Sequence, residues 1–120
     1  MENDIITLER VEKSFGQQKV LKQVDLSVPE QSVYAFLGNN GEGKSTTIRM
    51  LTGLLRADAG DIRVLGKNVM TDGVAIRKEL GCIVDSPALY PQLTASEFLS
   101  IGVRLKNLSK SEIDRVLNLV

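Results

Sequence analysis

Apolar and polar residues alternate with a period of two at the start of the chain, as in strands with one exposed face. Residues 5–11 form the first such segment and residues 24–28 the second. A polar turn at residues 14–18, which contains Gly16, joins them, and Pro29 stops the second segment. The pattern predicts an antiparallel, half-exposed sheet.

The next apolar segment differs because it does not alternate. Residues 33–37 read VYAFL, a run typical of a strand that is covered on both faces. Beyond a glycine-rich stretch, Ile48, Leu51 and Leu55 recur at helical spacing, and this spacing predicts a helix over 44–55.

Shorter elements follow this helix. Residues 61–65 alternate as another strand, and residues 74–80 predict a helix. Residues 81–84 read as a short buried strand, in which Cys82 is expected to be a small core residue. A loop with two prolines is expected at 85–94.

Two sequences with the pattern of a capping box predict helix starts. In each, a hydroxyl residue precedes a glutamate by three positions: Thr94 with Glu97, and Ser109 with Glu112. The second helix carries an apolar stripe at i, i+3, i+4 and i+7, formed by Ile113, Val116, Leu117 and Val120. Because the sequence ends on this stripe without a capping residue, we expect the chain to be part of a longer protein.

The composition narrows the class of protein. The chain has 120 residues, 42% of them hydrophobic, and its 15 basic residues balance 15 acidic ones. Nucleic-acid binders usually carry a basic excess, so we expect no nucleic-acid partner. There is no apolar run of membrane-spanning length, no secretory signal pattern and only one cysteine, and we therefore expect a soluble cytoplasmic protein.

The chemistry lies in residues 38–46, which read GNNGEGKST. They fit the phosphate-binding pattern G-x-x-x-x-G-K-[ST], placed between a predicted buried strand and a predicted helix. The glycines let backbone N–H groups approach a polyphosphate, and the helix aims its N-terminus at the same anion. Lys44 is placed to meet the β- and γ-phosphates, Ser45 to ligate Mg²⁺, and Thr46 to donate a further hydrogen bond. The alternative is a glycine-rich turn with no ligand, but it does not account for this spacing in this setting.

The similarity extends beyond the loop, because residues 38–46 resemble the loop of ABC-transporter ATPases, usually GPNGAGKST. Asn39 and Glu42 depart from that pattern, and neither departure removes a backbone amide or the lysine. Further resemblances cover nearly the whole chain: residues 14–16 with Val20 and Leu21, 51–54, 60–62, 80–84 and 87–94.

The resemblance implies a nucleotide site with named residues. Phe15 would stack on adenine, and Lys44 would be the catalytic lysine. A packing role is the alternative for Phe15. The residues expected to bind the nucleotide are Phe15, Val20, Gly38, Asn39, Asn40, Gly41, Glu42, Gly43, Lys44, Ser45 and Thr46.

Asp85 stands where the family usually has a glutamine that helps to bind Mg²⁺ and the attacking water. The block 83–90 resembles bacitracin- and lantibiotic-resistance exporters, which commonly carry a glutamate there, one methylene longer than the aspartate of this chain. A carboxylate can ligate Mg²⁺ but cannot donate a hydrogen bond. We therefore expect Asp85 to lie near Mg²⁺, together with Ser45; the alternative is a solvated loop acid. In the family, residues 87–98 would lie near the surface that contacts the membrane subunit; the alternative from the sequence alone is a packed loop.

The fold class that the resemblance implies is α/β: a P-loop NTPase with an N-terminal antiparallel β-subdomain and the start of a helical subdomain. Residues 1–120 would form the N-terminal half of an ABC-type ATP-binding domain. The intact protein would bind ATP and Mg²⁺, pair with a second nucleotide-binding domain and drive a membrane permease from the inner face of the membrane. The sequence shows neither the family's signature motif nor a Walker B strand, so we expect the 120-residue piece alone to have little ATPase activity.

Two alternatives to a transporter ATPase stay open. One is a nucleotide-binding module that does not hydrolyse ATP. The other is an ABC-type protein that works without a permease, in DNA repair or translation. A small-molecule kinase would also use this loop, but it would not explain Phe15 or residues 87–94.

Overall fold

The structure is a computed structural model that describes residues 3–120. The chain divides into two compact units, of which the first ends at Asp85 and the second is Ser86–Val120. The first unit contains β1 (Asp4–Phe15), β2 (Gln18–Pro29), α1 (Lys44–Leu51), β3 (Ala59–Val64), β4 (Lys67–Asn68) and α2 (Val69–Glu79). The second contains α3 (Ala95–Lys106) and α4 (Ser111–Leu117). None of the helices described in residues 3–120 is long and apolar enough to cross a bilayer.

The first two strands form the predicted antiparallel hairpin, but they are longer than residues 5–11 and 24–28. The pairing register shifts near Arg10 and Gln23, whose φ angles are 48° and 49°. Such bulges interrupt the alternation from which strand limits are read. The N–H of Arg10 donates to Oδ1 of Asp25 across the hairpin at 2.7 Å.

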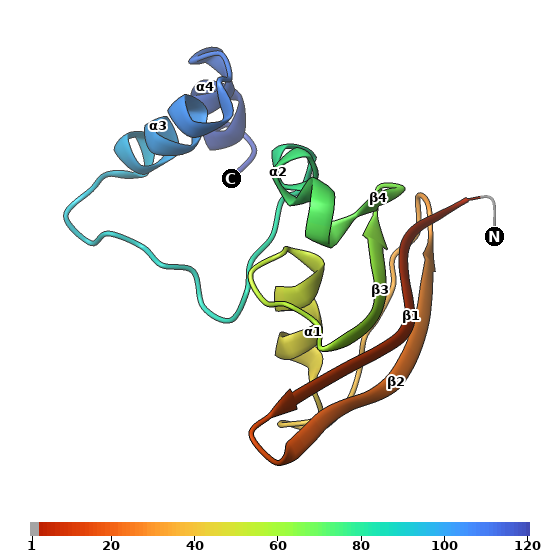
Figure 1. The fold of residues 1–120 in the computed structure, drawn as a ribbon. Coiled ribbons are helices and arrows are strands. Elements are labelled where there is room, and N and C mark those ends of the chain that lie inside the picture. Colours follow the sequence, from red (N-terminus) through yellow and green to blue (C-terminus); the bar gives the residue numbers. More distant parts are fainter. Residues whose placement is uncertain (1–2) are drawn as a thin grey trace. The chain divides into compact units, whose positions relative to one another are not determined.

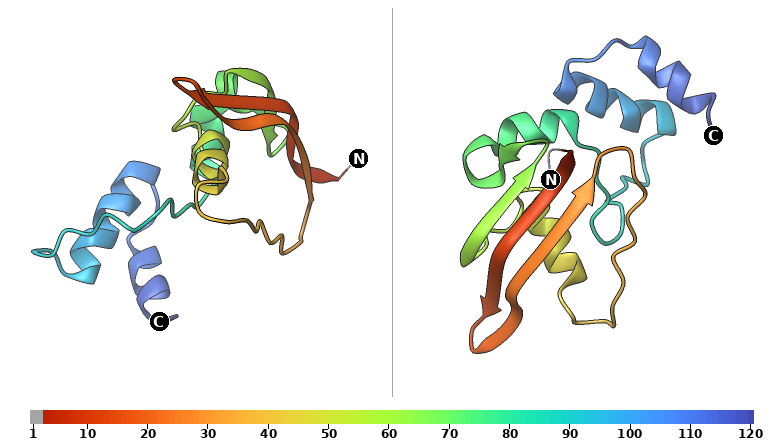
Figure 2. Two further views of the ribbon diagram at one scale, coloured as in Figure 1. Left: turned by 90° about the horizontal axis from the view of Figure 1, so that it is seen from below. Right: turned by 90° about the vertical axis from the view of Figure 1, so that its right-hand side faces the viewer.

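The four strands lie in the order β2-β1-β3-β4, and every pair is antiparallel. Helices α1 and α2 lie on one face of this sheet, as the views in Figures 1 and 2 show. The core of the unit joins the sheet to these two helices. Its buried residues are Leu8, Val11, Leu21, Met50, Ile62, Val64, Val69 and Ile76.

The predicted buried strand at residues 33–37 is absent from the structure. All residues from 31 to 40 are exposed and belong to no strand, and Figure 2 shows this part of the chain as a long trace between β2 and α1. Val33 and Leu37 are 103% and 88% exposed. A strand that is covered on both faces needs neighbouring strands to hydrogen-bond with and layers that cover it. None of the strands described in residues 3–120 pairs with residues 33–37.

The prediction of a buried strand at 81–84 is wrong for the same reason. These residues are in no regular element, and Cys82 is exposed rather than part of the core. The strand predicted at 61–65 is confirmed as β3, with limits one or two residues away.

Both helices of the first unit differ in length from the prediction. Helix α1 ends at Leu51 rather than at residue 55, and Gly53 follows with a φ of 72°. A left-handed glycine at this position terminates a helix. Helix α2 begins earlier than residue 74, because the side chain of Asn68 accepts from the N–H of Met70 at 2.8 Å and caps it.

In the second unit, the capping box at Thr94 is confirmed. Its hydroxyl accepts from the N–H of Glu97 at 3.2 Å, and Oε2 of Glu97 accepts from the N–H of Thr94 at 2.8 Å. The capping box predicted for Ser109 and Glu112 does not form. Helix α4 begins one residue later than such a box would place it, with Lys110 at the cap position and no side-chain cap.

Candidate functional site

The glycine-rich loop leads directly into α1, as the sequence predicts. Gly41 and Gly43 have φ angles of 86° and 92°, in the left-handed region that favours glycine. Gly43 is also buried, and a Cβ added there would lie 2.7 Å from Cδ2 of Leu21 and 3.1 Å from Cγ1 of Val20. The second strand of the hairpin therefore supports the backbone of the loop, and a side chain at position 43 would separate the two.

The start of α1 presents unpaired backbone donors. The first bond of the helical ladder runs from the N–H of Thr47 to the carbonyl of Gly43 at 2.8 Å. The N–H groups of Lys44, Ser45 and Thr46 precede this bond and have no acceptor within the helix. The first turn of this fully described helix carries no acidic side chain. This end of α1 is therefore suited to an anion.

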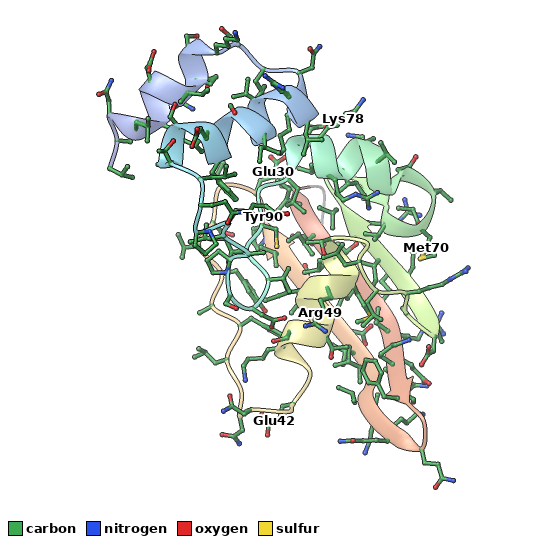
Figure 3. All side chains as sticks on the ribbon, turned by 90° about the vertical axis from the view of Figure 1, so that its left-hand side faces the viewer. Glu30, Glu42, Arg49, Met70, Lys78 and Tyr90 are labelled. Atoms are coloured by element: carbon green, nitrogen blue, oxygen red, sulfur yellow. The ribbon has the colours of Figure 1, made fainter. Side chains whose placement is uncertain are left out.

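Polar side chains within the loop fold back on it. The ammonium group of Lys44 donates to the carbonyls of Gly38 and of Asn39, the latter at 2.7 Å. The carboxylate of Glu42, which Figure 3 shows at the turn of the loop, accepts from the backbone N–H of Asn39 at 2.6 Å and from Nδ2 of the same residue at 3.1 Å. In this conformation the Asn39 amide is therefore occupied by Glu42, a point that the sequence alone did not reveal.

Asp85 lies against α1, although it is distant in sequence. Its carboxylate forms an ion pair with the guanidinium of Arg49, which Figure 3 labels on α1. The hydrogen bond from Arg49 lowers the pKa of the Asp85 carboxyl below its ordinary value, against the opposing effect of desolvation, and Ser45 adds a smaller lowering. The structure thus brings together Ser45 and Asp85, the two residues predicted to lie near Mg²⁺.

Phe15 lies at the end of β1, where it pairs with Gln18 across the hairpin turn. The ring is 50% exposed, and Nζ of Lys13 lies 5.5 Å from its centroid. Lys13 is fixed by Asp58, whose Oδ1 is 2.7 Å from its ammonium group. An exposed, anchored ring is compatible with stacking on a base, and the same hairpin brings Val20 to Gly43.

The remaining predicted residues line the same loop. Asn40 and Gly41 are exposed at its turn, Ser45 is exposed at the start of α1, and Thr46 is half-buried. The sequence reasoning missed Arg49. Its signal was present, because a basic residue four positions after Ser45 lies on the same face of a helix.

Magnesium ions are usually held by one or two protein oxygens together with phosphate oxygens. The hydroxyl of Ser45 and the carboxylate of Asp85 supply oxygens of this kind on one face of α1. The positive-φ glycines, the unpaired amides and Lys44 provide the donors that a triphosphate needs. The residues present therefore fit ATP with Mg²⁺.

Comparisons with known proteins agree with this geometry. A family model described as ABC transporter matches residues 21–120. The chain is 38% identical over 117 residues to the bacitracin transport ATP-binding protein BcrA of Bacillus licheniformis. It is 32% identical over 117 residues to the protein of the same name from Enterococcus faecalis. Each alignment covers 97% of this chain but only 38% of the relative.

A solved structure described as an ATP binding subunit of an ABC transporter superposes on the fold with a TM-score of 0.80. The two sequences are 30% identical, and the match covers 92% of this chain and 46% of that one.

Proposed function

Since this chain belongs to the ABC transporter ATP-binding family, we propose that its P-loop binds ATP with Mg²⁺ and that the whole protein couples ATP hydrolysis to transport across a membrane. The observation that carries the proposal is the loop at residues 38–46, in which left-handed glycines, Lys44 and the first amides of α1 converge. The chain would be the N-terminal part of the ATP-binding domain, because it spans 38% of the two BcrA relatives.

Each residue of the site has a role in this proposal. The amides of residues 40–46 and the ammonium of Lys44 would hold the phosphates, and Phe15 would stack on the base. Ser45 and Asp85 would hold Mg²⁺, which neutralises charge on the β- and γ-phosphates when it is bound. To bind phosphate, Lys44 would exchange its carbonyl partners in the loop for phosphate oxygens.

The partners are proposed from the family. ABC transporter ATP-binding subunits generally work with permeases, and we place the whole protein on the inner face of the membrane, beside a permease and a second nucleotide-binding domain. The 120-residue chain by itself would bind ATP with little turnover, since its sequence shows no signature motif and no Walker B strand.

Export of a peptide antibiotic is the substrate class that we favour. Two relatives are described as bacitracin transport proteins, and the acidic residue of this chain at position 85 is compatible with that group.

A titration of the 120-residue chain with a fluorescent ATP analogue and Mg²⁺ tests the proposal. The Lys44→Ala variant should bind roughly ten- to a hundredfold more weakly, because it loses a charged hydrogen-bond donor to phosphate. Lys67→Ala is the matched control, since Lys67 lies on β4 and pairs with Glu79 at 2.9 Å. Equal affinity of wild type and Lys44→Ala, or no binding by the wild type, would overturn the proposed function.

A further inference from the structure

Two side chains on one face of α1 lie near the same carboxylate. Ser45 and Arg49 are four residues apart, so they project from adjacent turns of the helix. The guanidinium of Arg49 pairs with Oδ2 of Asp85, and the hydroxyl of Ser45 is near enough to this carboxylate to add slightly to the lowering of its pKa. The carboxylate therefore lies along the helix, next to the residue proposed to ligate Mg²⁺.

The backbone at Asp85 is not in a conformation that an isolated aspartate would favour. Its φ angle is 59°, in the left-handed region, which disfavours a residue with a Cβ. Leu80 is the last residue before it to pack on the core, and residues 81–83 are exposed. The contacts with α1 therefore fix the position of the carboxylate at the end of an otherwise weakly held segment.

A guanidinium at this place has a specific consequence for an acidic residue. It pairs with one carboxylate oxygen and leaves the lone pairs of the other for a further partner. A glutamine would offer Arg49 only a neutral carbonyl oxygen, and that hydrogen bond would be weaker. The ion pair therefore depends on the negative charge of Asp85, which the glutamine usual in the family lacks.

We propose that Arg49 is a positioning residue, which holds the carboxylate of Asp85 beside Ser45 so that the other carboxylate oxygen and the Ser45 hydroxyl are available to the Mg²⁺ that accompanies the nucleotide. The inference rests on the proposed function and deepens it, because it names the residue that makes an aspartate usable at this position.

A merely structural role for the pair predicts a different outcome. Arg49 and Asp85 are 50% and 45% exposed, and an exposed ion pair contributes little to the stability of a fold. The pair of Arg63 with Asp61 is a matched control on the same unit, with 55% and 40% exposure and a separation of 2.9 Å. Loss of either pair should change folding stability to a similar, small extent, whereas only the first should affect the dependence of nucleotide binding on Mg²⁺.

The test measures the affinity of the chain for a fluorescent ATP analogue in Mg²⁺ and in EDTA. The readout is the ratio of the two dissociation constants. We expect Arg49→Ala to reduce the gain in affinity due to Mg²⁺ by roughly two- to fivefold, with the affinity in EDTA unchanged. Arg49→Lys should restore part of the gain, Arg63→Ala should leave it intact, and Asp85→Asn combined with Arg49→Ala should lose no more than Asp85→Asn alone.

The other outcomes distinguish a failure of the proposed function from a failure of the role proposed for Arg49. If the wild type does not bind the analogue, the proposed function fails and this inference fails with it. If the wild type binds but Arg49→Ala keeps the full gain from Mg²⁺, or loses affinity equally in EDTA, only the inference is overturned. Circular dichroism checks the fold of each variant, and Arg49→Gln replaces Arg49→Ala if the latter does not fold.

Discussion

At the scale of single residues, Gly43 joins the proposed phosphate-binding loop to the sheet. Its φ of 92° disfavours any residue with a Cβ, and the added carbon would meet the buried Leu21 at 2.7 Å. Gly41 has a similar φ of 86°, but a Cβ there would meet nothing within 4 Å. A side chain at position 41 would therefore cause backbone strain alone, whereas a side chain at position 43 would cause both backbone strain and a steric clash.

This difference predicts unequal effects of the same substitution. Gly41→Ala should lower the free energy of unfolding by about 1 kcal/mol, through backbone strain alone. Gly43→Ala should lower it by about 2–3 kcal/mol, because Leu21 must also shift. Urea unfolding followed by circular dichroism measures both values, and equal midpoints for the two variants would contradict the contact between the loop and β2.

Most residues of the candidate site could be named from the sequence, because a short motif with fixed spacing identifies them, and their roles in binding stay predictions. The glycines, Lys44 and Ser45 could be named from sequence. The bond from the Asn39 amide to Glu42 and the pairing of Arg49 with Asp85 could not, because each depends on side-chain conformations or on contacts distant in sequence. Cys82 was misplaced because its burial depended on a strand that does not form.

At the scale of elements, α3 and α4 provide a comparison of two helix starts. Both sequences fit a capping box, but only the pair of Thr94 and Glu97 forms one. The hydroxyl of Ser109 instead lies 2.9 Å from that of Ser111. A pattern of four residues predicts a cap, but the backbone around it decides where the helix begins.

Thr94→Ala should therefore destabilise the start of α3 by about 1 kcal/mol, whereas Ser109→Ala should have little effect on α4. The backbone hydrogen bond from Thr94, followed by the one from its hydroxyl, lowers the pKa of Glu97 below its ordinary value of 4.5. The contribution of Glu97 to helix stability is therefore present above pH 4.5 and lost as the pH falls through the lower, folded-state pKa.

Hydrogen exchange of the first amides of α3 measures both effects. Glu97→Gln should remove the increase in exchange rate that acid causes at the start of α3. An unchanged exchange rate in Thr94→Ala would contradict the capping role of Thr94.

The elements that failed in the sequence analysis share one cause. The hairpin and β3 formed as predicted because their strands find pairing partners within the described residues, β2 beside β1 in the chain and β3 far from it in sequence. Residues 33–37 and 81–84 carry the apolar composition of buried strands, but burial depends on neighbours that the described residues do not supply. Composition indicates what a segment would do in a sheet, not whether the sheet is present.

At the scale of the molecule, the chain combines a compact β-subdomain with an apolar segment that is left uncovered. The sheet, α1 and α2 share one core, whereas Val33 and Leu37 are fully or largely exposed. The proposed phosphate-binding loop follows the uncovered segment directly and leads into α1, and the hairpin supports it through Gly43. The candidate site is therefore held in place by the contact of Gly43 with β2.

Hydrogen exchange of the whole chain with and without ATP and Mg²⁺ tests the central claim, that residues 38–46 bind the nucleotide. We expect amides in this loop and at the start of α1 to exchange up to roughly a hundredfold more slowly at a ligand concentration about 100 times the dissociation constant. The amides of residues 33–37, which are in no strand, should exchange rapidly without ligand. Unchanged exchange at 38–46, or protection confined to other segments, would contradict the account.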